Sequence, residues 1–167
     1  IDIIFFDVED QGTSIIGQDM SHTWCLGSQH WSEYPHTPDY KARYGILLDM
    51  VGGKEARFIP DPISNAYAYN VVKKVWNQAR KIGFGRYFLL EEIDNYNLLD
   101  DHVFINVFTQ QLGRHIPTID IIEYDASHGQ GHTFNKFWHT HGDDMQNIDK
   151  ETLNAVGQTV LSVIYNE

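Results

Sequence analysis

Three short, almost continuous apolar runs constrain the fold of this 167-residue chain more than any other feature. They cover Ile1–Phe6, Tyr44–Val51 and Ile116–Ile122. Runs of this length and composition are typical of strands that are covered on both faces in a parallel sheet. Segments with helical spacing of their apolar residues lie between the runs. The sequence therefore predicts an α/β domain with a parallel or mixed sheet.

The helical segments have recognisable ends. After Ser64 the apolar residues recur at helical spacing, and Gly83 follows the last of them. We therefore expect a helix with Ser64 as its N-cap and Gly83 as its stop. Asp149 is the expected N-cap of the last helix of the chain. Weaker helical patterns cover Trp24–Tyr34 and Asp101–Leu112.

The charge balance excludes some classes of partner. The chain has 12 Lys and Arg against 23 Asp and Glu, which gives a formal net charge of -11. Nucleic-acid binding depends on clustered cationic side chains, so this composition argues against it. The chain also lacks an apolar run of about 18 residues, so no membrane span is expected in it. A single cysteine leaves the redox compartment undetermined.

Acidic side chains follow the carboxyl ends of the apolar runs. Glu9 and Asp10 follow the first run, Asp49 lies at the end of the second, and Glu123 and Asp125 follow the third. Ligands of open α/β sheets bind at the carboxyl ends of strands, so these acids are expected to surround a site. A cation is the expected counter-charge, because few Lys or Arg residues lie near them. Considered alone, Asp49 is equally compatible with a buried acid that accepts hydrogen bonds from loop N–H groups.

Histidine supplies a second type of ligand. His139 lies beside Trp138 in a polar loop before the last helix, and His141 competes with it for the same role. Asp100–His102 forms a further cluster at the start of a predicted helix, where acids can also act as caps. Carboxylate and imidazole ligands together are typical of zinc, and a neighbouring acid can transfer protons. Most of the other histidines are expected on the surface or in loops.

Several common catalytic and metal-binding motifs do not occur in the chain. It has no HExxH, no CxxC pair, no P-loop and no GxSxG. Cys25 is a conceivable nucleophile, but its surroundings in the sequence favour a core or helix position. Any metal site must therefore be assembled from residues that lie far apart in the sequence.

Short motifs do occur along the whole chain in a fixed order. They are FFDVED at 5–10, LGS at 26–28, GILLDMVG at 45–52, DDH at 100–102, IPTIDII at 116–122, and WHT at 138–140 followed by NID at 147–149. In this order they resemble the zinc aminopeptidase and glutaminyl cyclase superfamily. The resemblance implies a three-layer α/β/α fold of the zinc-exopeptidase type, with a mixed, mainly parallel sheet and the metal at the strand ends.

The resemblance also implies roles for individual residues. Glu9 corresponds to the general acid/base, Asp10 to a zinc-binding carboxylate, and His139, rather than His141, to the zinc-binding imidazole. Trp138 would stack against the substrate, although a packing role suits it equally well. The superfamily usually has a second glutamate at the position of Asp10, so this carboxylate reaches the metal with one methylene fewer.

Two activities compete within the superfamily. Cyclases hold one zinc ion, keep the acid that matches Asp49 as a hydrogen-bonding group, and have Asp-Asp-His. Aminopeptidases commonly hold two zinc ions and have Ser-Asp-His. Asp100–His102 therefore favours a cyclase that converts N-terminal Gln to pyroglutamate with release of ammonia, with Glu9, Asp49 and Asp100 as catalytic residues. In contrast, cyclases often have His where Asp120 stands. An aminopeptidase and a catalytically silent binding domain are the alternatives.

The resemblance has further implications for the whole protein. Both subfamilies have another metal-binding Asp before the segment with which this chain begins. Residues 1–167 are therefore expected to be the C-terminal part of a longer catalytic domain. The expected partner is the N-terminus of a peptide or protein, and the expected location is periplasmic or secreted.

Overall fold

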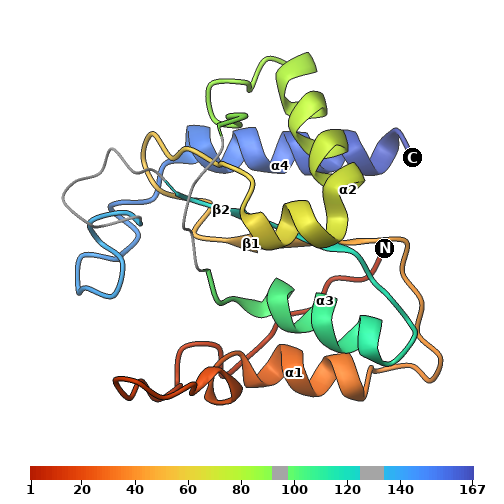
Figure 1. The fold of residues 1–167 in the computed structure, drawn as a ribbon. Coiled ribbons are helices and arrows are strands. Elements are labelled where there is room, and N and C mark those ends of the chain that lie inside the picture. Colours follow the sequence, from red (N-terminus) through yellow and green to blue (C-terminus); the bar gives the residue numbers. More distant parts are fainter. Residues whose placement is uncertain (92–97, 125–133) are drawn as a thin grey trace.

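The computed structural model of the chain describes residues 1–91, 98–124 and 134–167 (Figure 1). The helices are η1 (Ser21–Thr23, 3-10), α1 (Leu26–Glu33), α2 (Pro62–Lys81), α3 (Asp101–Gln111) and α4 (Lys150–Tyr165). The strands β1 (Gly45–Asp49) and β2 (Thr118–Ile122) pair in parallel, which confirms the predicted α/β class. None of the helices in these three ranges is long and apolar enough to cross a membrane.

Helices lie on both sides of the strand pair (Figure 1): α2 and α4 on one side, α3 and α1 on the other. Alternation along β2 divides its side chains between the two sides. Ile119 and Ile121 join the hydrophobic core with α2 and α4, in which Trp76 is fully buried. Asp120 lies between them in the strand and points towards His102 on α3. An acidic side chain is therefore buried on the α3 side of the sheet.

The predicted first strand is wrong. Residues 1–6 form no strand, and within the described ranges no backbone hydrogen bond joins them to β1 or β2. A strand is stable only where its N–H and C=O groups have a paired neighbour. The side chains of this segment that remain exposed include Ile1, Ile3 and Phe5.

The N-terminus of α2 also differs from the prediction. Asp61, not Ser64, is the N-cap: its carboxylate accepts hydrogen bonds from the N–H groups of Ile63 and Ser64, both at 2.9 Å. Pro62 occupies the first turn, where its fixed φ and missing N–H suit a helix start. The Ser64 hydroxyl instead accepts from the N–H of Asp120 at 2.9 Å. The helix therefore begins earlier than expected and is bonded directly to β2.

The other helix ends agree with the sequence. Gly83 has φ 94°, the left-handed conformation of a helix stop. Asp149 accepts a hydrogen bond from the N–H of Glu151 at 2.9 Å, as expected for the N-cap of α4. The two weaker helical patterns form α1 and α3.

Asn106 fastens α3 to β2. It is fully buried, and its amide nitrogen donates to the carbonyl oxygens of His102 at 2.9 Å and Thr118 at 2.7 Å. Its amide oxygen accepts from the N–H of Thr118 at 2.9 Å. These bonds place the first turn of α3 beside the strand.

We expect Asn106→Ala to lower the free energy of unfolding by about 2–4 kcal/mol, because it leaves buried backbone groups without partners. Urea denaturation followed by circular dichroism measures this change. Asn154→Ala is the matched control, since Asn154 is exposed on α4 and should change stability by less than about 0.5 kcal/mol. Equal effects of the two variants would contradict the assigned role of Asn106.

Candidate functional site

Glu9 and Asp10 lie on a loop that the N-terminus of α1 holds in place. The N–H of Cys25 donates to the carbonyl oxygen of Glu9 at 3.0 Å, and the N–H of Leu26 donates to that of Val8 at 3.1 Å. Val8 and Cys25 both have φ 53°, a left-handed conformation that is rare for non-glycine residues and a clear outlier for a β-branched one. Tertiary contacts therefore impose the path of this loop.

The left-handed conformation also occurs at a predicted site residue and beside another. His139 has φ 56°, and Met50, directly after Asp49, has φ 47°. Left-handed non-glycine residues are concentrated at functional sites, where the surrounding structure maintains them. The sequence gives no signal for these conformations, because none of the residues is the glycine or asparagine that usually adopts them.

Asp10 and His139 form a pair that could hold a metal ion. Asp10 Oδ1 lies 3.3 Å from His139 Nε2, and the two side chains are 60% and 47% exposed. A charge-assisted hydrogen bond would be about 2.7–2.9 Å. Two ligands at about 2.0–2.2 Å from a tetrahedral zinc ion are about 3.3–3.5 Å apart. The observed separation is within hydrogen-bonding distance and is also compatible with two ligands of one metal ion. His141 is not part of this pair.

An aromatic wall stands next to the pair. The ring of Trp138 stacks on the His139 ring at 4.0 Å and 19°, and Phe134 packs against Trp138 at 4.9 Å. Trp138 is 42% exposed, so part of its ring remains open to a ligand. The arrangement is compatible with both interpretations of Trp138 from the sequence.

Glu9, Asp49 and Asp100 form an acidic cluster with shifted pKa values. Burial, strengthened by the charges of Asp10 and Asp100, raises the pKa of Glu9 to about 8. Burial and the charge of Asp100 raise the pKa of Asp49 to about 7. Burial also raises the pKa of Asp100, although the N–H of Asp101 partly offsets it. Groups with pKa values near neutrality can both accept and donate protons, as general acid/base chemistry requires.

The DDH segment combines capping with this cluster. Asp100 Oδ1 accepts from the N–H of Asp101 at 2.6 Å and caps α3. Polar atoms of Asp100, Glu9 and Cys25 lie within 4.8 Å of one another. The capping and site interpretations of Asp100 are thus compatible. Cys25 is fully buried, as predicted, and burial raises the pKa of its thiol.

Two acids near this site were not predicted to act in it. Asp61 and Asp120 are buried on either side of His102, with ring-nitrogen distances of 3.1 Å and 3.6 Å. The sequence contained a signal that Asp61 is an N-cap: Asp61 is followed by Pro62, and both residue types favour a helix start.

Of the two acids after the third apolar run, the structure describes Glu123. It is buried and accepts a hydrogen bond from the side-chain amide of Asn135 at 3.2 Å. Asp125 lies outside the described residues.

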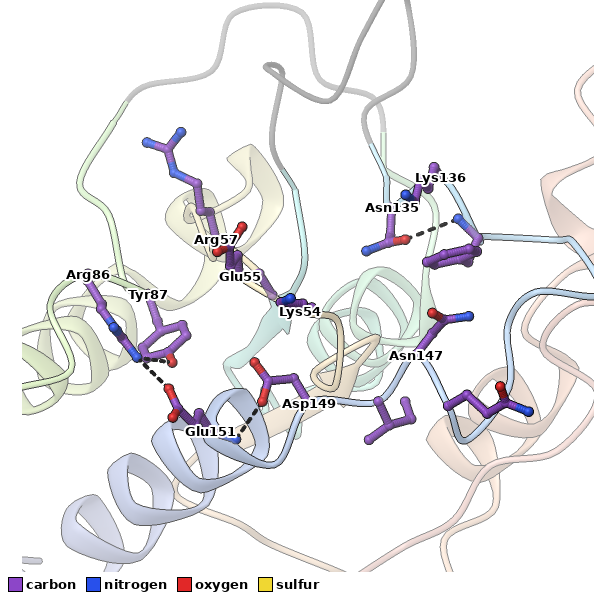
Figure 2. A pocket seen from close by; sticks show the side chains of 14 residues that line it. Lys54, Glu55, Arg57, Arg86, Tyr87, Asn135, Lys136, Asn147, Asp149 and Glu151 are labelled. Carbon is purple, nitrogen blue, oxygen red and sulfur yellow. Dashed lines mark hydrogen bonds and ion pairs between the residues drawn. The ribbon is translucent and has the colours of Figure 1, made fainter.

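A cavity of about 910 Å³ opens beside the start of α4 (Figure 2). None of the predicted site residues lines it, although Phe137 is adjacent to Trp138 in the chain. Two of the cationic side chains on its wall form ion pairs, Arg86 with Glu151 and Arg57 with Glu91, both at 3.0 Å. The residues of the acidic cluster are not among those that line the cavity.

The fold and geometry define an α/β protein with a cluster of acidic residues whose pKa values are raised and with a candidate metal pair. The chain belongs to Peptidase family M28, whose family model matches residues 1–164.

Solved structures extend this relationship. The chain is 48% identical to Bacteroides thetaiotaomicron glutaminyl cyclase bound to N-acetylhistamine, with TM-score 0.87 and coverage of 98% of this chain and 53% of that one. It is 43% identical to Porphyromonas gingivalis glutaminyl cyclase, with TM-score 0.84 and coverage of 97% and 52%. It is 46% identical to a Zn-dependent exopeptidase from Parabacteroides distasonis, with TM-score 0.86 and coverage of 98% and 53%. No curated protein sequence matches the chain. The chain thus spans about half the length of these solved relatives.

The raised pKa of Asp49 predicts a pH-dependent stability. Its folded value of about 7 lies above the unfolded value of 3.8, so its stabilising contribution is complete below about pH 4 and is lost as the pH rises through 7. We expect wild type to lose more stability than Asp49→Asn between about pH 4 and 7. Urea denaturation in the presence of a chelator measures the difference.

The control for this experiment is Asp39→Asn. Asp39 is exposed and has φ 56°, a conformation that asparagine tolerates well. This variant should follow the wild-type pH dependence. Parallel curves for wild type and Asp49→Asn would show that the Asp49 carboxyl is not destabilised by its surroundings.

Proposed function

We propose that the protein containing this chain is a zinc-dependent glutaminyl-peptide cyclotransferase, which converts an N-terminal glutamine to pyroglutamate and releases ammonia. The observation that carries the proposal is the closeness of Glu9 and Asp100 within an acidic cluster, on the loop that also bears the metal-pair residue Asp10. The similarity to solved glutaminyl cyclases supports it. The substrate would be the N-terminus of a peptide or protein.

Asp10 and His139 would hold the zinc ion, and the 3.3 Å between their ligand atoms fits two positions of a tetrahedral shell. A bound zinc ion supplies Lewis-acid polarisation of the γ-carbonyl of the substrate glutamine. Trp138 would form the wall against which the substrate side chain packs.

Glu9 would transfer the proton. Its carboxylate accepts a proton from the α-amine as the amine nitrogen bonds to the carbonyl carbon of the side-chain amide. It then gives that proton to the amide nitrogen, whose bond to this carbon breaks so that it leaves as ammonia. The pKa of about 8 suits a group that must be both base and acid near neutral pH. Asp49 and Asp100 would hold Glu9 and sustain this pKa through their charge. Because the reaction is intramolecular, positioning the amine against the carbonyl contributes much of the rate.

The proposal extends to the whole domain. Residues 1–167 would form the C-terminal part of a three-layer α/β/α domain with a mixed, mainly parallel sheet. Helices on both sides of β1 and β2 support the layered arrangement. The enzyme would act in the periplasm or after secretion.

A zinc aminopeptidase is the second candidate. The similarity to a Zn-dependent exopeptidase favours it, and Asp49 would then bind a second zinc ion instead of bonding to Glu9. The number of zinc ions per chain, one or two, therefore separates the two candidates. A catalytically silent binding domain would have neither activity.

We expect Glu9→Gln to lower kcat for a Gln-initiated peptide by about 10²–10⁴-fold, because the variant cannot accept the α-amine proton. The assay follows ammonia release and pyroglutamate formation by the full-length protein. Glu33→Gln, an exposed change on α1, is the control and should keep full activity. Hydrolysis of aminoacyl anilides without pyroglutamate formation would establish the aminopeptidase instead. Undiminished activity in Glu9→Gln would rule out its catalytic role.

The metal pair predicts different effects for two neighbouring histidines. We expect His139→Ala to weaken zinc binding by roughly 100-fold or more, since it removes a direct ligand. His141→Ala should bind zinc like wild type, because His141 lies outside the pair. Equilibrium dialysis followed by metal analysis measures both affinities. A larger loss in His141→Ala would reassign the ligand.

A further inference from the structure

The cavity beside the start of α4 has no role in the proposed reaction (Figure 2). Residues 54–57 form part of its wall, and the backbone fixes this segment at both ends. Gly53 pairs with Ile148 before the segment, and Phe58 pairs with Phe88 after it. The volume of about 910 Å³ lies within the range of about 300–1,000 Å³ that is usual for ligand pockets. The cavity is therefore a framed space that is large enough for a ligand.

Cationic side chains are concentrated on this wall. The whole chain has 12 Lys and Arg against 23 Asp and Glu, whereas the wall has four cationic residues against three acidic ones. The charge balance of the wall is thus opposite to that of the chain, which favours an anionic ligand. The four cationic residues are Lys54, Arg57, Arg86 and Lys136.

Two of these cations are not engaged by an acid. Within residues 1–91, 98–124 and 134–167, neither Lys54 nor Lys136 forms an ion pair, and both are exposed. Lys136 Nζ lies over the ring of Phe137, 4.9 Å from its centroid. Figure 2 shows Lys136 on the opposite side of the cavity from the Arg86–Glu151 ion pair. A carboxylate can therefore approach either lysine without displacing an existing partner.

The acids of the wall do not neutralise these lysines. Glu151 pairs with Arg86 at 3.0 Å, and Asp149 accepts the N–H of Glu151 as the cap of α4. The third acid, Glu55, is exposed. Among the described residues it forms no ion pair with a lysine. The positive charge on the wall is therefore available to a ligand.

The cavity wall continues directly into the candidate metal pair. Phe137 lines the cavity, and Trp138 and His139 follow it in the chain. Two residues span at most about 7 Å, so the backbone of His139 lies within about 7 Å of that of Phe137. An extended peptide advances about 3.3 Å per residue. A peptide whose N-terminal residue lies at the metal pair can therefore reach the cavity with its next few residues.

We propose that this cavity is the subsite for the residues that follow the N-terminal glutamine, and that Lys54 and Lys136 give it a preference for an acidic side chain among the first three of them. The inference rests on the proposed function, which places the N-terminal glutamine at Trp138 and His139. The favoured substrates are peptides or proteins with Asp or Glu shortly after an N-terminal Gln. Ion pairs with exposed lysines are weak, so the effect is a selectivity and not a requirement.

The first test compares matched peptides as substrates of the full-length protein. Each begins with Gln, carries either Glu or the isosteric Gln at the second, third or fourth position, has Ala elsewhere and ends in an amide. We expect kcat/KM for ammonia release to be about 2- to 10-fold higher with Glu at the best position, mainly through KM. The ratio should fall towards one in 1 M salt, where the screening length is about 3 Å. Ratios near one at all three positions in low salt would overturn the proposal.

Variants test whether the preference comes from this wall. Lys54→Gln and Lys136→Gln should each lower the Glu-to-Gln ratio of kcat/KM, and the double change Lys54→Glu with Lys136→Glu should bring it below one. A packing defect would not reverse a preference. Lys41→Gln is the matched control and should keep the wild-type ratio, since Lys41 is exposed and precedes β1, whereas Lys54 follows it. An unchanged ratio in both single variants, or an equal loss in Lys41→Gln, would overturn the proposal.

A binding measurement separates this proposal from the proposed function. Isothermal titration calorimetry with Glu9→Gln protein measures the affinity for the same peptides without turnover, and the Glu peptide should bind about 2- to 10-fold more tightly. If wild type releases no ammonia but this difference is present, the proposed function is overturned and the subsite is supported. If ammonia is released with equal kcat/KM for the Glu and Gln peptides, the subsite alone is overturned. Equal affinities for the two peptides would also overturn the subsite.

Discussion

Acidic side chains that are buried or half-buried beside one another are the constraint on which the rest of this structure depends. Glu9, Asp49, Asp100 and Asp120 all have raised pKa values, and burial is the largest cause for each. Uncompensated carboxylates in such surroundings cost several kcal/mol each. The chain compensates with retained protons, with backbone N–H groups and with the His102 imidazole. The same compensations leave proton donors and acceptors side by side, which is the arrangement that acid/base chemistry needs.

Helix N-termini supply much of this compensation. Asp61 caps α2 and Asp100 caps α3, so both carboxylates accept N–H groups at the positive end of a helix dipole. The start of α1 contributes in another way, because its N–H groups bind carbonyl oxygens of the Glu9 loop. Three helices that are separate in the sequence thus begin around one acidic cluster. For Asp100, the capping bond does not conflict with the proposed catalytic role, because the same side chain caps α3 and lies beside Glu9.

The sequence predicted the elements whose signals are local. The cap at Asp149, the stop at Gly83 and both strands of the observed pair follow from residue type and periodicity. The same logic failed for residues 1–6, since an apolar run becomes a strand only beside a partner, and pairing is not a local property. It also failed for Asp61, because the apolar periodicity of α2 does not mark its first turn. For the site acids, the sequence predicted only that they lie at the same edge of the sheet. It did not predict which of them are in contact.

The short side chain of Asp10 shows why the remaining part of the site was not predictable. The superfamily usually has a longer acid there, yet Asp10 Oδ1 and His139 Nε2 are 3.3 Å apart. The backbone provides the approach: His139 has φ 56°, and Val8 near Asp10 has φ 53°. Such conformations cost about 1–3 kcal/mol each and persist only when other contacts impose them. Here the N-terminus of α1 imposes them on the Glu9 loop through three successive N–H groups. The approach of Asp10 to His139 therefore depends on how the start of α1 holds the backbone of the Glu9 loop. Residue type alone does not reveal this dependence.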